Sequence, residues 1–468
     1  MTITYDSLLS EITAPDGRDI LDPATGELVG KAPFRSVDVL DDAIARAKAA
    51  QPAWASRSDD ERKALLLQAA DAIDAAAEPL AELLSREQGK PLEGPNARFE
   101  VGACANWLRA TAATELPGRT LIDDGETHAT IHYRPLGVVG AIGPWNWPMM
   151  ISIWQIAPAL RMGNTVVVKP SEYTPLSVLA LAHVLDTVLP TDVVNVVAGE
   201  GDLGARLSSH PDIAKLMFTG STRTGQAIIK SSADTVKRLT LELGGNDAGI
   251  VLADVDPKAI AQELFWGAFI NTGQTCAALK RLYVHTDVYD DVCRELAEVA
   301  NTTPMGRGLD EANVLGPLQN KAQFDIVADL VDKARSSGAT ILTGGAPDAE
   351  APGYFYPTTL VANIDNANPL VSEEQFGPAL PIVRFESVEE AVEMANGLDV
   401  GLGASVWSAD LDAARAVAAR IQAGTVWINS HGGVHPMIPF GGVKKSGYGL
   451  EFGVEGLAAV SAPQVING

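Results

Sequence analysis

Short segments rich in valine and isoleucine alternate with helical stretches along most of this chain, and no other feature restricts its fold as strongly. After residue 160, strands are expected at Thr165–Val168, Val193–Val197, Leu216–Phe218 and Leu239–Leu243. The alternation restarts at residue 248 and predicts strands at Ala248–Leu252, Leu282–His285, Thr340–Leu342, Leu380–Phe385, Ala404–Trp407 and Thr425–Asn429. Strands separated by helices are joined by right-handed crossovers, which build a parallel sheet covered on both faces. The sequence therefore predicts two doubly wound α/β domains.

Helices and an exposed strand are expected before residue 135. Ser36 is a candidate N-cap for a helix whose buried face carries apolar residues at helical spacing, namely Leu40, Ala43, Ile44 and Ala47. A second helical run covers Leu66–Leu84. The segment Thr127–Tyr133 alternates with the period of a strand. We expect this strand to be an exposed arm with which the tail from Leu457 can pair.

Residues 135–160 contain no charged side chain, and this run is long enough to raise the question of a membrane span. Glycines and prolines interrupt it, at Gly137, Gly140, Gly143, Pro144, Pro148 and Pro158. A lipid-facing helix does not readily accommodate so many breakers. We therefore expect a buried strand and loop here, and no membrane partner.

The charge of the chain argues against another class of partner. Its 35 lysines and arginines and 59 aspartates and glutamates give a net charge of −24, and such a surface repels the phosphates of nucleic acids. The three cysteines, Cys104, Cys276 and Cys293, match neither a disulfide framework nor a metal cluster. The first twelve residues lack the pattern of a signal peptide. We expect a cytoplasmic protein that binds neither nucleic acid nor metal.

Cys276 and Glu242 are the candidate nucleophile and base. Cys276 lies in the small and polar run NTGQTCA after the helical stretch Pro257–Ile270, whereas Cys104 and Cys293 lie within helical patterns typical of buried thiols. Glu242 lies near the end of an apolar strand, where one leucine separates it from two glycines. A carboxylate there faces the crevice in which α/β folds bind ligands. Taken singly, each residue could equally be structural.

Three further segments carry groups suited to a ligand. Asn146 lies between two tryptophans and two prolines in GPWNWP, where its amide either satisfies the loop or donates to a ligand oxygen. The turn FTGSTRTG follows a strand and opens a helix, so its backbone N–H groups and the Ser221 hydroxyl can face a phosphate. Lys169 and Glu172 follow another strand and suit ribose hydroxyls.

Seven motifs occur in a fixed order along the chain: WNWP, VKPSE, FTGSTRTG, LELGG, NTGQTC, EEQFGP and PFGGVKKSG. Together they closely resemble the NAD(P)-dependent aldehyde dehydrogenase superfamily, over essentially the whole chain. The resemblance implies a Rossmann-like cofactor domain, a catalytic domain and a small β-arm that joins subunits into a homodimer or homotetramer. We expect the NAD-binding domain in residues 1–116 and 135–244, the catalytic domain in 245–445, and the arm in 117–134 and 456–468.

The resemblance also implies a role for each matching residue. Cys276 matches the nucleophile, Glu242 the general base, Asn146 the side-chain donor of the oxyanion hole, and Glu451 a glutamate that relays protons. The residues expected to bind NAD are Trp145, Lys169, Glu172, Gly220, Ser221, Gly225, Leu243, Glu374 and Phe376. Those expected to line the substrate pocket are Trp147, Ile151, Trp154, Thr275 and Phe440.

The implied reaction oxidises an aldehyde to a carboxylic acid and reduces NAD or NADP, through a cysteine thiohemiacetal and a thioester. Glu172 favours NAD, because a carboxylate accepts a hydrogen bond from a 2′-hydroxyl and repels a 2′-phosphate. The uncharged window Trp147–Trp154 favours an apolar, aromatic or medium-chain aldehyde.

Two departures from the family pattern and two alternative functions stay open. Asn246-Asp247 stands where many members have Lys-Ser or Lys-Ala, and Leu450 replaces a frequent arginine. A cofactor-free cysteine hydrolase or acyltransferase would also use a thiol and a base, but usually places a histidine beside the thiol. A non-catalytic binding homologue predicts that the nucleophile or the base is lost, and both are present.

Overall fold

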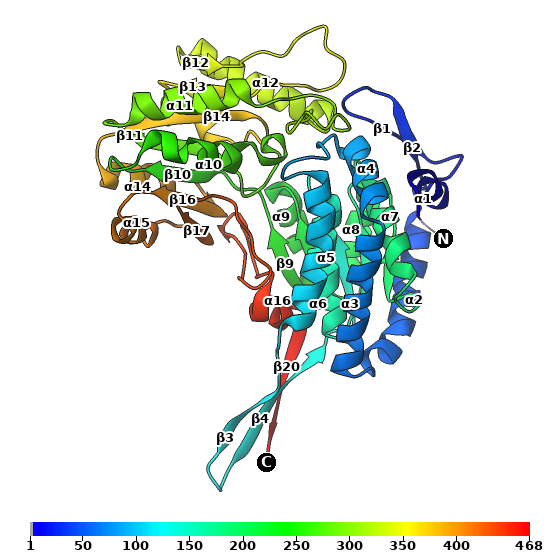
Figure 1. Ribbon diagram of the computed structural model, residues 1–468. Helices are drawn as coiled ribbons and strands as arrows, with labels where there is room; N and C mark the ends of the chain where they lie inside the picture. The colour runs from blue at the N-terminus through cyan, green and yellow to red at the C-terminus, as the bar shows by residue number, and fades with distance from the viewer. Residues whose placement is uncertain (1–2) are drawn as a thin grey trace.

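The computed structural model describes residues 3–468. Figure 1 shows two lobes, each built on one large sheet, and a narrow arm that extends from the first lobe and carries the C-terminus. The first lobe contains a six-stranded sheet of order β19-β9-β8-β5-β6-β7. These strands are β5 (Val138–Ile142), β6 (Thr165–Lys169), β7 (Val194–Val196), β8 (Ile213–Thr219), β9 (Arg238–Glu242) and β19 (Gly447–Tyr448). All pair in parallel except β19, which pairs antiparallel with β9.

Helices cover both faces of this sheet, and the period of the strands decides which residue meets which layer. Val138 and Ile142 of β5 share a core with α2 (Val37–Ala55), α8 (Gly201–Ser209) and α9 (Thr222–Ser232). Val139 and Ala141, on the opposite face, pack in a second core. That core includes α3 (Asp59–Ala75), α4 (Ala77–Gln88), α5 (Ala97–Ala113), α6 (Pro148–Arg161) and α7 (Pro175–Asp186). The doubly wound arrangement is thereby confirmed.

Two local predictions need correction. Residues 66–84 form parts of two helices that meet at Ala76, because Pro79 in a continuous helix would clash with the carbonyl of residue 75. Residues 135–160 hold strand β5 and a loop as predicted, but also most of helix α6. Every residue of α6 is buried, so no amphipathic period marks it. Pro148 occupies its first turn, where the missing N–H costs no helix hydrogen bond.

The second lobe contains a seven-stranded sheet of order β12-β13-β14-β11-β10-β16-β17. Its strands are β10 (Asp247–Val251), β11 (Leu279–His285), β12 (Thr340–Thr343), β13 (Thr359–Ala362), β14 (Ala379–Phe385), β16 (Gly403–Trp407) and β17 (Thr425–Ile428). The sequence did not predict β13, which pairs antiparallel with β12. Helices α10 (Pro257–Phe269) and α11 (Tyr289–Thr302) pack with one set of core residues. Another set packs with α12 (Lys321–Ser336), α14 (Val388–Asn396) and α15 (Leu411–Ala418).

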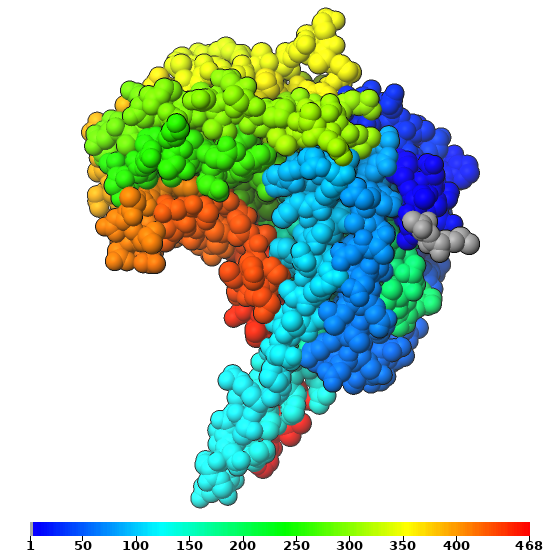
Figure 2. All heavy atoms as spheres, in the orientation of Figure 1, coloured from blue at the N-terminus to red at the C-terminus, as the bar shows by residue number. Residues whose placement is uncertain are grey.

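The arm is a three-stranded antiparallel sheet that projects from the body (Figure 2). It consists of β3 (Arg119–Asp123), β4 (His128–Pro135) and β20 (Ser461–Asn467). The predicted pairing of the tail with the arm is confirmed, since Ser461–Asn467 pairs with residues 129–135. Smaller elements complete the fold: α1 (Tyr5–Ile12), β1 (Arg18–Leu21), β2 (Leu28–Ala32), η1 (Ala233–Thr235), η2 (Ile270–Gly273), α13 (Pro369–Ser372), β15 (Val400–Gly401), β18 (Val443–Lys444) and α16 (Gly453–Ala459).

Within residues 3–468, no helix combines the length and the apolar content needed to cross a bilayer. In the same part of the chain, no group of three or more His, Cys, Asp or Glu side chains could hold a metal ion.

Candidate active site

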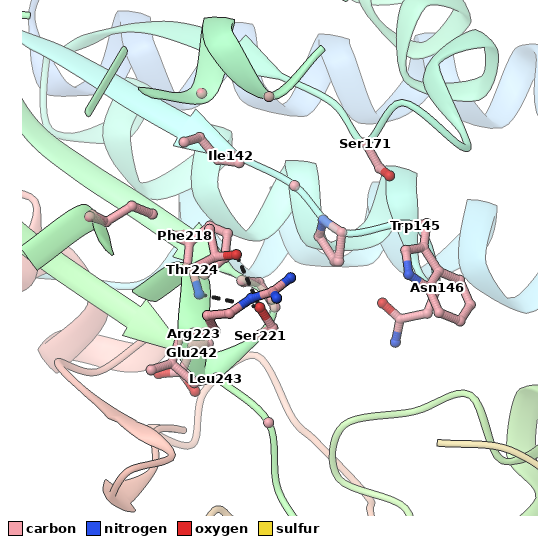
Figure 3. Close-up of a pocket in the computed structure, with 18 of the residues that line it drawn as sticks. Ile142, Trp145, Asn146, Ser171, Phe218, Ser221, Arg223, Thr224, Glu242 and Leu243 are labelled. Carbon is pink, nitrogen blue, oxygen red and sulfur yellow. Dashed lines mark hydrogen bonds between the residues drawn. The ribbon is translucent and has the colours of Figure 1, made fainter. Parts of the chain in front are cut away.

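A pocket of about 760 Å³ opens at the carboxyl ends of β5, β6, β8 and β9 and is closed on its other side by residues of the second lobe. This is the edge at which doubly wound sheets bind ligands. The pocket brings together Cys276, Glu242 and Asn146. Most of the residues expected to bind NAD also line it: Trp145, Lys169, Glu172, Gly220, Ser221, Leu243, Glu374 and Phe376. Figure 3 shows part of this lining.

A strained turn presents Cys276 to the pocket. Asn271, Thr272 and Gly273, just before it, have φ of 50°, 57° and 76°, a left-handed conformation that costs non-glycine residues energy. Gly273 is required here, because a Cβ would lie 2.3 Å from the carbonyl oxygen of Gly377. The Asn271 amide holds the turn by donating to the Asn146 carbonyl oxygen at 2.9 Å.

The Cys276 thiol is half-buried, whereas Cys104 and Cys293 are buried. Burial raises the pKa of Cys276 to about 12, although the Lys280 ammonium opposes this rise. The thiol therefore needs a base or a cation before it can act as a nucleophile near neutral pH.

The Asn146 side chain is 3% exposed and its Nδ2 donates to the Gln274 carbonyl oxygen at 2.9 Å. This bond ties the WNWP loop to the turn that carries Cys276. Lys90 donates to the Asn146 carbonyl oxygen at 2.8 Å from the other side. The amide is thereby held beside the nucleophile, where its second N–H can serve an oxyanion.

Glu242 ends β9 and is 4% exposed, and neither carboxylate oxygen has a hydrogen-bond partner among the described residues. Burial, reinforced by the nearby charge of Glu451, raises its pKa well above the usual value. A carboxyl group with a raised pKa is suited to accept a proton from water near neutral pH. The PFGGVKKSG segment braces this strand end, since Ser446 donates to the Gly244 carbonyl oxygen at 2.9 Å.

Glu451 does not line the pocket but lies behind Glu242, buried to 2% exposure. Its backbone pairs with that of Phe440. Burial raises its pKa to about 7, while the charge of Lys215 lowers it. Lys215 is itself 2% exposed and donates to the Thr240 hydroxyl at 2.7 Å. Charge interactions therefore connect Glu242 with Glu451 and Glu451 with Lys215, and all three groups are buried.

The residues predicted to contact the ribose and the phosphates, Lys169, Glu172 and Ser221, also line the pocket. Lys169 Nζ lies 3.2 Å from Glu172 Oε2. Burial raises the pKa of Glu172, but the Lys169 charge and hydrogen bonds outweigh it, so the pKa is lowered and the group is ionised at neutral pH. Ser221 caps helix α9, where its oxygen accepts from the Thr224 N–H at 3.3 Å (Figure 3). The positive end of α9 and its free N–H groups suit a phosphate.

Gly225 does not line the pocket but lets α9 approach its wall, because a Cβ there would lie 2.7 Å from the Leu243 side chain. On the opposite wall, Phe376 packs edge-on against Trp145 with ring centroids 5.4 Å apart. Phe376 has a φ of 46°, so surrounding contacts must hold this strained residue in place. Burial raises the pKa of Glu374, and Lys280 opposes this rise.

The residues expected at the substrate pocket do not line the 760 Å³ pocket. Trp147 is buried beside it and donates its indole N–H to the Thr275 hydroxyl at 2.9 Å. Trp154 packs against Trp107 and Phe452 around a small cavity of about 10 Å³. Ile151 and Phe440 are buried in the same core as these tryptophans. Their role as substrate contacts stays a prediction.

Sequence reasoning missed three buried lysines around the site, Lys90, Lys215 and Lys280. The sequence indicates burial for two of them, because each lysine lies within a mostly apolar segment: Lys215 in IAKLMF and Lys280 in AALKRLYV. A charged residue is rarely buried without a partner. Which partners they meet depends on segments far away in the sequence.

The fold and the pocket define a class, namely two-lobed α/β enzymes with a cysteine facing a dinucleotide-sized cleft. Comparison with known proteins identifies the family within this class. Residues 12–466 match the model of the aldehyde dehydrogenase family. Aldehyde dehydrogenase LUC3 from a Fusarium species is 41% identical, over 93% of this chain and 92% of its own length. Phenylacetaldehyde dehydrogenase from Pseudomonas fluorescens is 40% identical, over 93% of this chain and 89% of its own.

A solved structure of an aldehyde dehydrogenase is also similar to this chain in fold and sequence. An NAD⁺ complex of aldehyde dehydrogenase from Bacillus cereus has a TM-score of 0.92 and 35% identity, covering 96% of this chain and 92% of that one. The chain belongs to the aldehyde dehydrogenase family, which implies oxidation of aldehydes and use of NAD(P).

Proposed function

We propose that this protein oxidises an apolar, aromatic or medium-chain aldehyde to its carboxylic acid with reduction of NAD. One observation carries the proposal: Cys276, Asn146 and Glu242 line the same pocket as the residues suited to a dinucleotide. The cofactor fits this pocket. Its volume of about 760 Å³ is within the range of cofactor sites, with Lys169 and Glu172 for a ribose, the start of α9 for phosphates, and Glu374 beside Cys276.

Each catalytic group has a defined task in this proposal. Cys276 reacts as the thiolate: its Sγ bonds to the aldehyde carbon, the C=O π bond breaks, and the oxygen becomes an anion that Asn146 Nδ2 and the Cys276 N–H stabilise. Bound NAD supplies the acceptor for the hydride that leaves this carbon. The carbon then remains attached to Cys276 as a thioester. Glu242 takes a proton from water, the water oxygen bonds to the thioester carbon, and Cys276 leaves as a thiolate.

The apolar substrate preference rests on the uncharged helix start beside the site. Trp147, Ile151 and Trp154 are all buried among apolar side chains. The relative named phenylacetaldehyde dehydrogenase is consistent with an aromatic substrate. The competing hydrolase has less support, because none of the seven histidines, all in the described part of the chain, lines the pocket that contains Cys276.

The test of the function is NADH formation from NAD and a panel of apolar and charged aldehydes. Cys276→Ala should abolish the reaction, whereas Cys104→Ser and Cys293→Ser should retain it as matched controls. A cofactor-free hydrolase would form no NADH, and a binding homologue would bind NAD without turnover. A preference for a carboxylated or quaternary-ammonium aldehyde would contradict the substrate class alone.

We also propose that the arm joins copies of the chain into a homodimer or homotetramer in the cytoplasm. All five residues of β3 are exposed, and the arm exposes four large apolar side chains, Leu121, Ile122, Val465 and Ile466. Exposed apolar surface of this kind marks an interface. Light scattering should show an oligomer that the pair Ile122→Asp and Val465→Asp weakens. The three free thiols suit a reducing compartment.

A further inference from the structure

Lys280 is a charged residue in the buried strand β11, and its side chain is 2% exposed. Removal of an ammonium group from water is costly unless partners replace the water. Lys280 Nζ donates to the carbonyl oxygens of Thr275 at 2.6 Å and Cys276 at 2.7 Å. It also lies 3.3 Å from Glu374 Oε1. The ammonium thus has two carbonyl oxygens as hydrogen-bond acceptors and one carboxylate oxygen within ion-pair distance.

The contacts of Lys280 join two neighbouring segments that both contribute to the pocket lining, the Cys276 turn and residues 374–376. Its ammonium lies 5.4 Å from the centre of the Phe376 ring, within range of a cation–π contact. Its backbone carbonyl accepts from Gln375 Nε2 at 3.1 Å. Residues 374–376 are thus bound to the Cys276 turn through one lysine, both at its backbone and at its side chain.

The charges around Cys276 make this lysine unusual. Three carboxylates act on the thiol, those of Asp247, Glu374 and Glu242, and all three disfavour a thiolate. Lys280 is the cation that favours it. Without this charge, burial and the carboxylates would act on Cys276 unopposed.

We propose that Lys280 is a positioning residue that fixes the Cys276 turn to Glu374 and Phe376 and supplies the positive charge beside the nucleophile. This inference rests on the proposed function, because it requires Cys276 to be the reacting thiol. It connects the chemical centre with the segment expected to hold the nicotinamide ribose, since both depend on one buried ammonium group.

The test measures the reactivity of the Cys276 thiol in the protein without bound cofactor. Alkylation of Cys276 by iodoacetamide is followed by peptide mass at several pH values, because its rate follows the thiolate fraction. An opposite charge near a titratable group shifts its pKa by about one to three pH units, so Lys280→Met should slow alkylation at a fixed pH by about tenfold or more. Lys280→Arg keeps the charge and should recover most of the rate.

Lys237→Met is the matched control. Lys237 is also buried, at 9% exposure, and donates to one backbone carbonyl, that of His210 at 2.7 Å, but it lies at the opposite end of the first sheet from the pocket. In the Lys237→Met variant, Cys276 should be alkylated at the same rate as in the unmodified protein. Lys280→Met should also weaken NAD binding, measured by calorimetry, because Glu374 and Phe376 lose their common partner.

An alkylation rate in Lys280→Met within about twofold of the unmodified rate would overturn the role of Lys280. If Lys280→Met fails to fold, Lys280→Gln and Lys280→Arg are compared, and equal rates in these two would overturn it as well. The proposed function is judged separately by Cys276→Ala: an inactive Cys276→Ala with an unaffected Lys280→Met refutes only the role of the lysine, whereas an active Cys276→Ala refutes both.

Discussion

Lys90 and Glu100 form an ion pair behind the Asn146 loop, with Nζ 2.6 Å from Oε2 and both side chains fully buried. Lys90 also donates to the Asn146 carbonyl oxygen. Glu100 Oε1 accepts the N–H groups of Met149 and Met150 at the start of α6. The pair therefore holds both ends of the short segment that carries Asn146 and Trp147.

Removal of one partner of this pair should destabilise the protein strongly. Lys90→Met leaves the Glu100 carboxylate buried without its cation, and such a change costs about 3–5 kcal/mol. Thermal unfolding should show a clear decrease in Tm, and turnover should fall because the Asn146 loop loses a support. Lys321→Met breaks an exposed pair with Asp325 and should change the unfolding free energy by about 1 kcal/mol or less. If both variants lowered the unfolding free energy equally, the buried Lys90–Glu100 pair would not stabilise the protein more than an exposed pair does.

Asn146→Ala should slow turnover by about 10² to 10³, the usual effect of losing one oxyanion donor. Binding of NAD, measured by calorimetry, should stay nearly intact, because the amide acts on the substrate oxygen. An unchanged kcat would return Asn146 to a purely structural role in tying the loop to Gln274.

Glu242→Gln separates the two chemical stages. Hydride transfer requires Cys276 and the oxyanion donors, whereas thioester hydrolysis requires a base to take a proton from water. Rapid mixing with excess aldehyde and NAD should give close to one NADH per active site and then very slow turnover. Intact mass should show an acyl group on Cys276. Absence of both burst and adduct would move Glu242 to thiol activation, and normal steady-state turnover would remove it from the mechanism.

Glu451→Gln should move the pH dependence of deacylation. Burial and the Glu451 charge raise the pKa of Glu242, and the base works only when it is deprotonated, so activity should decline as pH falls through this raised pKa. Without the Glu451 charge, the pKa of Glu242 falls and the acidic limb of the kcat profile should shift to lower pH. A shift to higher pH, or none, would show that the two carboxyl groups do not interact.

Glu172 should set the preference for NAD. Glu172→Gln removes the charge that repels a 2′-phosphate and should lower the ratio of kcat/KM for NAD to that for NADP. Glu389→Gln, which neutralises an exposed carboxylate paired with Arg420 away from the pocket, serves as the control and should leave the ratio unchanged. A protein that uses NADP as well as NAD before any substitution would contradict the assigned role of Glu172.

The sequence by itself indicated most of the strands and the residues at their carboxyl ends. Alternation of apolar strands with helices is a local pattern, and parallel strands bring their carboxyl ends to one edge, so Lys169, Ser221 and Glu242 were expected near one crevice. The pocket contains all three. Helix α6 was not predicted, because a segment buried on every side shows no period that separates a helix from a strand.

The sequence determined the two α/β lobes and the chemical groups available to them, because periodicity and residue type are written locally. Only the tertiary structure decided the partners of the buried charges. Lys90 meets Asn146 from 56 positions away, and Lys280 meets Glu374 on a different segment of the second lobe. No local sequence pattern predicts these contacts, because they form only where segments distant in the sequence pack together. The pKa of each buried group depends on the same packing, because burial and neighbouring charges set it.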